Sequence, residues 1–171
     1  MKKITGLKLV AFATGIIFLS SCLTGGFETS DPTFEEEQAI LKAYIDTLIT
    51  NGRDVDTTSL GVYYVILEEG EGEFAKTGDT LTVGYSGYFV DGKLFDTSQS
   101  NNSGNENFEF ILDNPPMIPG WDDAMKVMNK NAKIQFIIPS GLAYGSTGSG
   151  IIPPYTTLIF VVKMVDIRPV N

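Results

Sequence analysis

The sequence of 171 residues contains no histidine and a single cysteine, Cys22. Without histidine, the chain cannot form a Ser-His or Cys-His nucleophile pair, or a metal site built on imidazole ligands. One cysteine cannot form an internal disulfide. These absences exclude several large classes of hydrolase and metalloenzyme.

Positive charge is also scarce. The 12 lysines and arginines are outnumbered by 21 aspartates and glutamates, which gives a net charge of −9 at pH 7. Nucleic-acid binding depends on Lys and Arg side chains that neutralise phosphates, so an acidic surface would repel a phosphate backbone. We therefore expect no nucleic-acid partner.

The hydrophobic run near the N-terminus is too short to span a membrane. It covers 11 residues, Leu9–Leu19, whereas a spanning helix needs about 20 apolar residues. Lysines precede the run, as in a secretory signal peptide. The ending Leu19-Ser20-Ser21-Cys22 resembles a bacterial lipobox, which implies a lipoprotein signal peptide over residues 1–21 and lipid attachment to the Cys22 sulfur. The alternative is a plain signal peptide followed by a chance cysteine.

Removal of residues 1–21 would leave 150 residues, enough for one domain with a hydrophobic core. The removed segment carries three lysines and no acidic residue, so 9 basic and 21 acidic residues remain, a net charge of −12. Because the sequence offers no basic patch for anionic lipid, membrane attachment would depend on acyl chains at Cys22. We expect a protein of the bacterial cell envelope, lipid-anchored to a membrane and facing outside the cytoplasm.

A tether over residues 22–32 and an N-terminal helix over residues 33–52 are expected next. Thr33 and Glu36 have the spacing of a capping box, and Asp31-Pro32 offers an alternative cap. Asn51-Gly52 ends the helix. An apolar stripe with helical spacing runs along it, formed by Leu41, Tyr44, Ile45 and Leu48. The helix could dock on its own domain, form a dimerisation surface or act as a spacer arm.

From Gly61 onwards the pattern is mostly that of β-strands. Residues 80–86 alternate between polar and apolar, as in a strand with one buried face, and Asp91-Gly92 is a hairpin signal. The remaining segments are predicted as strands over 62–67, 134–138 and 158–167, an acidic turn over 68–73, a polar loop over 99–107 and a helix over 120–128. We expect an α+β fold, in which a curved antiparallel β-sheet wraps around a short helix and the N-terminal helix is an extension.

The most informative segment is the apolar loop that precedes the last strand. Residues 144–160 read YGSTGSGIIPPYTTLIF. Loops exposed to water are usually polar, because apolar side chains gain nothing there. Ile151-Ile152, on a loop stiffened by Pro153-Pro154, therefore indicates a preformed apolar wall for a ligand.

Together with two further motifs, this segment resembles the FKBP family of peptidyl-prolyl cis-trans isomerases. The motifs are VGYSGYFVDGKLFDTS (residues 83–98) and FEFILDNPPMIPGWDDAM (residues 108–125), and all three occur in the family's order. The resemblance implies an FKBP-like isomerase domain over residues 60–168. It also implies an enzyme that acts on proline-containing polypeptides, with macrolides as possible inhibitors.

The resemblance also implies a role for each matching residue. Trp121 would form the floor under the proline ring, and the candidate catalytic residues are Tyr85, Asp96 and Tyr144. Asp96 would accept a hydrogen bond from the Tyr85 hydroxyl at the rim. Tyr144, through its hydroxyl, and Ile118, through its backbone N–H, would bind a substrate carbonyl. The other candidate substrate-binding residues would form the walls and an overhanging loop: Phe95, Phe108, Met117, Ile118, Ile151, Ile152 and Phe160.

Isomerisation of an X-Pro bond breaks no covalent bond, so the reaction needs no metal and no cofactor. At the transition state the amide is twisted and less dipolar, and an apolar cleft favours it over the hydrated planar amide. The expected function is to assist the folding of exported proteins. One alternative is an FKBP-fold binding module or holdase with negligible turnover. Another is an inert lipoprotein with a β-sandwich body, which leaves the apolar loop unexplained.

Overall fold

The structure, a computed structural model, describes residues 31–101 and 106–170, without the side chains of residues 100 and 101. The predicted signal peptide (1–21), the predicted lipidation site Cys22 and most of the predicted tether (22–32) lie outside the described residues. No helix within the described ranges is long and apolar enough to cross a membrane.

One long helix is followed by the strands of two antiparallel sheets, which short helices interrupt. In chain order they are α1 (Phe34–Thr50), β1 (Asp56–Thr57), β2 (Tyr63–Glu68), β3 (Glu71–Phe74), β4 (Thr80–Phe89), β5 (Leu94–Thr97), α2 (Ser98–Asn101), β6 (Phe108–Ile111), α3 (Pro119–Met125), β7 (Asn129–Lys130), β8 (Lys133–Ile138), the 3₁₀ turn η1 (Ser140–Leu142) and β9 (Leu158–Arg168).

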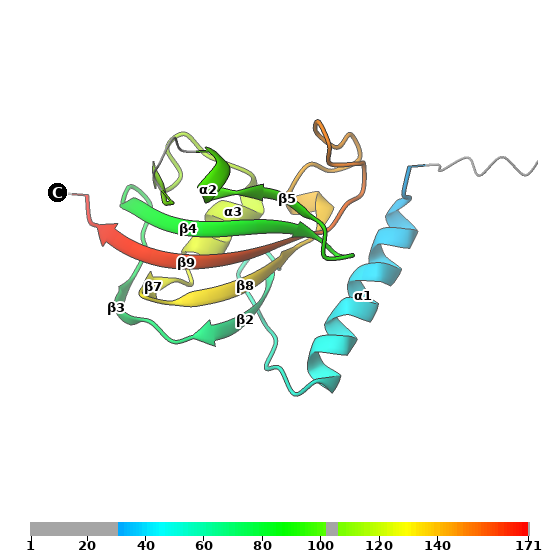
Figure 1. Cartoon of the computed structure of the whole chain (residues 1–171), viewed down its shortest axis with the longest axis horizontal. Helices are drawn as coiled ribbons and strands as arrows, with labels where there is room; N and C mark the ends of the chain where they lie inside the picture. Colours follow the sequence, from blue (N-terminus) through cyan, green and yellow to red (C-terminus); the bar gives the residue numbers. More distant parts are fainter. Residues whose placement is uncertain (1–30, 102–105, 171) are drawn as a thin grey trace, which may run out of the picture.

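The main sheet has the strand order β1-β2-β8-β9-β4-β5, and β6 also pairs with β4. One edge of the long β4 pairs with β9, while β5 and β6 share its other edge. β3 and β7 form a separate two-stranded sheet. The sheet curves around α3 (Figure 1), so the predicted α+β architecture is confirmed.

The two faces of the sheet bury two different sets of side chains, because successive residues of a strand point to opposite faces. On the face toward α3, Phe136 and Phe160 pack with Trp121 and Met125. On the other face, Ile137 packs with the helix α1. The core that positions the pocket therefore lies between α3 and the central strands.

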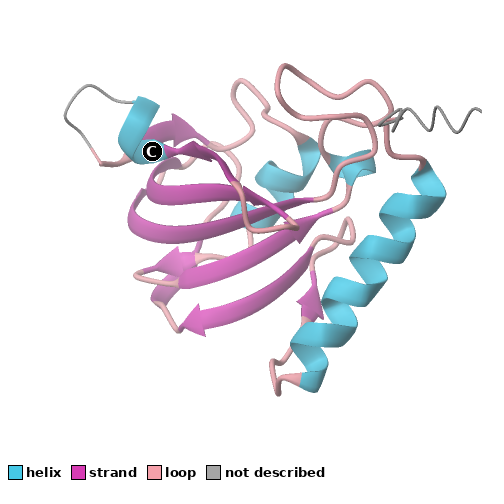
Figure 2. Cartoon of the chain, turned by 45° about the vertical axis from the view of Figure 1, so that its right-hand side comes forward, coloured by secondary structure: helices cyan, strands magenta, loops and turns pink. Residues whose placement is uncertain are grey.

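The helix α1 packs against the outer face of the sheet at one end of the strands (Figures 1 and 2). Its capping box is present: the Glu36 N–H donates to Thr33 Oγ1, and the Thr33 N–H donates to Glu36 Oε2. Leu41, 5% exposed, contacts Ile137 and Ile159. The apolar stripe predicted from the sequence thus docks on the chain's own domain.

Some predicted boundaries were wrong. The segment predicted as an acidic turn, residues 68–73, includes the first residues of β3, because β3 finds a partner strand in β7. The helix predicted over residues 120–128 ends at Met125, where the backbone turns and the Met128 carbonyl accepts from the Ala75 N–H. The polar loop predicted over residues 99–107 begins inside α2. β6 was not predicted as a separate strand.

Candidate functional site

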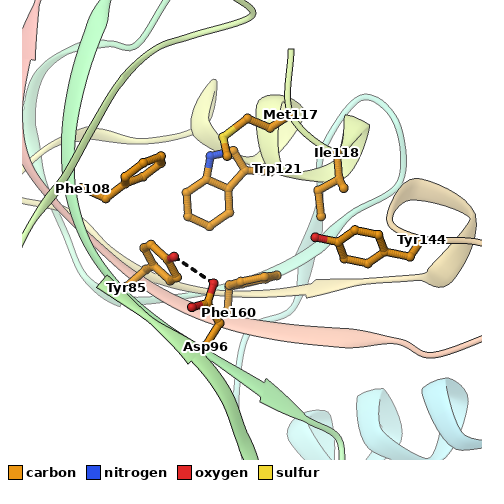
Figure 3. A pocket seen from close by; sticks show the side chains of 8 residues that line it. All are labelled: Tyr85, Asp96, Phe108, Met117, Ile118, Trp121, Tyr144 and Phe160. Carbon is orange, nitrogen blue, oxygen red and sulfur yellow. Dashed lines mark hydrogen bonds between the residues drawn. The ribbon is translucent and has the colours of Figure 1, made fainter. Parts of the chain in front are cut away.

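A single apolar cavity of about 240 Å³ brings together most of the site residues predicted from the sequence. It opens between α3, the central strands and the loop that follows η1 (Figure 3). Its lining consists of Tyr85, Asp96, Phe108, Met117, Ile118, Trp121, Tyr144 and Phe160. All eight are predicted site residues, and they come from six separate segments of the chain.

The pairing of the strands explains why these side chains meet. In the sheet, Gly87 of β4 lies opposite Asp96 of β5 on one side and Phe160 of β9 on the other. A Cβ atom at Gly87 would lie 2.8 Å from the Phe95 ring and 2.9 Å from the Phe160 ring. Glycine at this position therefore makes room for the aromatic wall.

Trp121 lies at the bottom of the cavity and is 4% exposed. Its ring meets those of Tyr85 and Phe160 edge to face, with centroids 5.3 Å and 5.2 Å away. Edge-to-face contacts of this kind bring the positive edge of one ring to the negative face of another. The indole is thereby held in one orientation, as the floor of an apolar pocket (Figure 3).

One charged group stands at the rim. The Tyr85 hydroxyl donates to Asp96 Oδ2 at 2.8 Å (Figure 3), the hydrogen bond that the resemblance implies. The Thr97 N–H donates to the second carboxylate oxygen at 2.8 Å. The two bonds fix the carboxylate beside the aromatic floor.

Two hydrogen-bond donors at the pocket have no acceptor within the part of the chain that the structure describes: the backbone N–H of Ile118 and the hydroxyl of Tyr144. Tyr144 is 36% exposed, and its hydroxyl points into the cavity on the side of Ile118 (Figure 3). The buried indole N–H of Trp121 also has no partner among the described residues. A buried polar group without a partner, such as this indole N–H, is rare in folded proteins unless a ligand or water satisfies it.

Sequence reasoning missed two buried carboxylates that hold α3 and the segment before it. Asp122 accepts from the Met117 N–H at 2.8 Å. Asp123 accepts from Ser59 Oγ at 2.7 Å and from the Leu60 N–H at 3.0 Å. The signal in the sequence was a pair of acidic residues near the start of a predicted helix, with Asp122 in its first turn, where carboxylates are favoured.

Opposing causes set the pKa values of these two carboxyls. Burial raises the pKa of Asp122 above its usual value, although the hydrogen bond from the Met117 N–H acts to lower it. Burial alone would also raise the pKa of Asp123. Hydrogen bonds from Thr58, Ser59 and the Leu60 N–H instead hold the pKa of Asp123 below its usual value.

Three predicted site residues do not line the cavity. Phe95 packs behind Phe160, with ring centroids 5.6 Å apart. Ile152 is 9% exposed and belongs to the core, whereas Ile151 is 70% exposed. The backbone bonds between Ser149 and Ile152 form a tight turn that gives the adjacent isoleucines opposite environments.

Within the described residues, no three His, Cys, Asp or Glu side chains are gathered closely enough to hold a metal ion. The polar groups of the pocket are one carboxylate, hydroxyls and N–H donors. Such an arrangement can bind an apolar group and a neighbouring carbonyl at the same time.

Comparison with known proteins gives one consistent family. The sequence model described as FKBP-type peptidyl-prolyl cis-trans isomerase matches residues 71–165. The chain is 42% identical over 117 residues to the FKBP-type peptidyl-prolyl cis-trans isomerase FkpA of Escherichia coli, which covers 68% of this chain and 42% of that protein. It is 41% identical to a probable FKBP-type isomerase of Haemophilus influenzae, over 69% of this chain and 47% of that one.

Solved structures agree. A crystal structure of FkpA from Escherichia coli has a TM-score of 0.65 and 37% identity, over 81% of this chain and 64% of that chain. A peptidyl-prolyl cis-trans isomerase from Pseudomonas syringae has a TM-score of 0.64 and 30% identity, over 82% of this chain and 99% of that chain. The matched segment thus spans less than half the length of the FkpA and Haemophilus sequences.

Proposed function

The chain belongs to the FKBP-type peptidyl-prolyl cis-trans isomerase family, and we propose that it catalyses the cis–trans isomerisation of X-Pro bonds in polypeptides. The observation that carries the proposal is the cavity floored by Trp121, with aromatic walls and donors at its edge.

The reaction sets a simple demand on the site. An X-Pro bond crosses a barrier of about 18–20 kcal/mol and isomerises unaided over tens to hundreds of seconds. The planar amide is polar and well hydrated, while the twisted amide has lost its resonance and is less dipolar. A water-poor aromatic cavity therefore lowers the barrier by favouring the twisted form.

Each group of the pocket has a part in the proposal. The proline ring lies on Trp121, between the rings of Tyr85 and Phe160. Neither the Ile118 N–H nor the Tyr144 hydroxyl has an acceptor among the described residues. In the proposal, both donate to carbonyls of the bound peptide. Asp96 polarises the rim through its bond to Tyr85. Phe95 supports the Phe160 wall from behind.

The location of the protein is part of the same proposal. Residues 1–22 have the features of a lipoprotein signal ending at Cys22, so the isomerase domain, proposed to cover residues 60–168, would be anchored by lipid outside the cytoplasm. Isomerisation needs no ATP and limits the folding of many chains. The proposed clients are exported proteins that fold at a proline-limited rate.

A second function, a binding module with negligible turnover, is favoured by the apolar rim. Met117 lines the pocket and is 42% exposed, and Ile151, on the loop that follows η1, is 70% exposed. Exposed apolar side chains around a cleft can hold unfolded chain without catalysis.

A proline-limited refolding assay on the fragment Thr24–Asn171 separates the two functions. Isomerase activity predicts that catalytic amounts of the fragment accelerate the slow refolding phase. A binding module would retard refolding or leave its rate unchanged, and would act only in amounts equal to those of the client.

A further inference from the structure

One buried carboxylate on α1 joins the helix to both ends of the loop that carries Tyr144. Glu37 is 2% exposed. One of its oxygens accepts from the Ser140 N–H at 2.6 Å and from Thr157 Oγ1 at 2.8 Å. The other accepts from Ser140 Oγ at 2.5 Å. Ser140 begins η1 and Thr157 immediately precedes β9, so the two donors lie at the two ends of one loop.

A short series of backbone hydrogen bonds connects Ser140, at the first end of this loop, to the neighbours of Tyr144. The Ser140 carbonyl accepts from the Ala143 N–H at 2.8 Å and from the Gly145 N–H at 2.9 Å. The Gly145 carbonyl in turn accepts from the Tyr155 N–H at 2.9 Å. The two residues that flank Tyr144 are thus both bonded to Ser140, which is bonded to Glu37.

The chemistry of Glu37 makes this contact hard to dispense with. Among the described residues no Lys or Arg pairs with it, so the cost of burying the carboxylate is offset by the donors of Ser140 and Thr157 alone. Hydrogen bonds to an ionised group are stronger than neutral ones, and a buried charge that loses them is heavily penalised. The helix α1 and both ends of the loop must therefore pack together.

A second contact between the same elements lies nearby. The ring of Phe34, at the start of α1, meets the ring of Tyr155 edge to face with centroids 6.3 Å apart. Tyr155 has a φ of 48°, in the left-handed region that non-glycine residues seldom adopt. The helix α1 thus contacts the C-terminal part of the loop at Tyr155, where the backbone takes an unusual conformation.

We propose that Glu37 is a positioning residue for the pocket. By fixing both ends of the loop over residues 139–157, Glu37 directs the Tyr144 hydroxyl toward Ile118. The effect on turnover rests on the proposed isomerase function, whereas the effect on the loop does not. The helix α1 is on this account part of the site's framework, although it lies on the opposite face of the sheet from Trp121.

Hydrogen exchange tests the structural half without any substrate. In the full chain, purified in detergent, Glu37→Ala should speed exchange of peptides from residues 139–157 by at least about tenfold, because their backbone bonds open more often. Peptides from β3 and β7 should be unchanged. The matched control is Glu35→Gln, since Glu35 is an exposed carboxylate in the same turn of α1, and the side-chain hydrogen bonds from α1 to the loop among the described residues are those of Glu37.

Two milder variants cover the case in which Glu37→Ala does not fold. Thr157→Val removes one of the hydrogen bonds and keeps the shape of the side chain. Glu37→Gln keeps an acceptor for the Ser140 N–H but removes the charge. Both should raise exchange in the loop by a smaller factor than Glu37→Ala. Unchanged loop exchange in all the folded variants would overturn the proposal.

Kinetics test the half that concerns Tyr144. Glu37→Ala should lower kcat/KM about tenfold, as expected when a catalytic group is displaced, and Glu37→Gln should restore part of the loss. In a Tyr144→Phe background the same change should alter kcat/KM by less than about twofold, because coupled residues are not additive. An equal loss in both backgrounds would show that Glu37 does not act through Tyr144.

The two experiments also separate this inference from the proposed function. If the parent protein shows no isomerase activity, the proposed function fails, and hydrogen exchange still decides whether Glu37 orders the loop. If the parent is active and Glu37→Ala retains full activity with an ordered loop, the positioning role fails while the isomerase survives.

Discussion

Trp121 and Asp96 both line the pocket but would contribute to different steps. Trp121 lines the cavity, and in the proposed function the bound proline would contact its apolar indole in every state of the reaction. The Asp96 carboxylate accepts a hydrogen bond from the Tyr85 hydroxyl, and in the proposed function it would act through that bond and through its charge at the rim. Mutation of the two residues should therefore separate binding from turnover.

Trp121→Leu should weaken the binding of proline peptides and of macrolide inhibitors while the domain stays folded. Replacement of a buried Trp by alanine costs about 3–5 kcal/mol in the free energy of unfolding, because it leaves a cavity in the core. Leucine keeps the floor apolar and avoids most of that cavity. Calorimetric titration with a proline peptide measures the loss. Phe110→Leu is the matched control, because Phe110 packs against Trp121 but does not line the cavity. Equal affinities for the Trp121 variant and the parent would place the binding site elsewhere.

Asp96→Val should lower kcat/KM by one to two powers of ten, which corresponds to about 1.4–2.7 kcal/mol in the barrier. Peptide affinity should fall less, because the carboxylate stands at the rim and the floor is untouched. Steady-state kinetics and titration on the same preparation give both numbers. Asp91→Asn, which removes an exposed carboxylate from the same hairpin, should match the parent. A kcat/KM unchanged by Asp96→Val would remove Asp96 from the catalytic residues.

The Asp123 carboxylate should make stability depend on pH. Its folded pKa lies below its ordinary value, because hydrogen bonds to the charged form outweigh burial. Its contribution is therefore present above the unfolded pKa of about 3.9 and is lost as pH falls through the lower folded value. Asp122 acts in the opposite sense, since its raised pKa favours the protonated form in the fold and its contribution is lost as pH rises.

Asp123→Asn should accordingly cost about 1–2 kcal/mol at pH 7, because it weakens the bonds from Ser59 and the Leu60 N–H. The difference from the parent should shrink as pH falls below the unfolded pKa of about 3.9, because protons then bind the carboxyl of the unfolded chain more readily than that of the folded protein. Urea unfolding over a pH series measures both. Asp54→Asn, at an exposed position, serves as the control. A difference that stays constant from pH 7 to pH 3 would contradict the lowered pKa.

At the scale of residues, the sequence led to eight side chains that do share one cavity. The order of the motifs predicts this shared cavity, because the motifs contain the strands β4, β5 and β9, whose pairing brings Tyr85, Asp96 and Phe160 together. The sequence could not show that Ile151 and Ile152 have opposite exposures, since this depends on the turn formed by Ser149 and Ile152. The functional roles of these residues stay predictions.

At the scale of elements, α1 shows how a local pattern and a tertiary contact combine. Its capping box and apolar stripe predicted the helix and the face that packs. Glu37 lies one turn before Leu41 on the face of that stripe, which its neighbours Glu35 and Glu36 do not share, but a charged residue there does not show from the sequence alone which groups would bind it. Its burial depends on Ser140 and Thr157, more than 100 residues away in the sequence.

Strand pairing explains the other errors at this scale. β3 is exposed along its whole length and carries glutamates, so its sequence reads as a turn. It is a strand because β7 supplies hydrogen-bond partners. β6 is only four residues long and gains its identity from the free edge of β4. Partners distant in the sequence cannot be read from either segment alone.

Leu41→Ala should destabilise the fold by about 2–4 kcal/mol, because Leu41 is 5% exposed and fills the contact of α1 with Ile137 and Ile159. Thermal unfolding followed by circular dichroism measures the change. The matched control is the neighbouring Ile40→Ala: Ile40 is 48% exposed, and its truncation should cost less than about 1 kcal/mol. Similar effects of the two substitutions would mean that α1 is not docked in solution as the structure has it.

At the scale of the whole molecule, charge and anchoring belong together. Without residues 1–21 the chain carries 9 basic and 21 acidic residues, a net charge of −12. Such a protein is repelled by anionic phospholipid within about one Debye length, roughly 8 Å at physiological salt. Electrostatic attraction therefore cannot hold it at a bacterial membrane, and the proposed attachment depends on acyl chains. A single acyl chain binds membranes only marginally, so more than one chain is expected for stable anchoring.

Cys22→Ser should abolish incorporation of labelled fatty acid and release the protein from the membrane fraction. The released protein should also fail to bind vesicles of anionic phospholipid, even at low salt, because nothing then offsets the repulsion of its acidic surface. Ser21→Ala is the matched control: it changes the residue next to the cysteine to another small one and should leave lipidation and fractionation as in the parent. Labelled fatty acid on the Cys22→Ser protein would refute the lipobox. Loss of label with the protein still bound to membranes would show that another part of the chain provides the attachment.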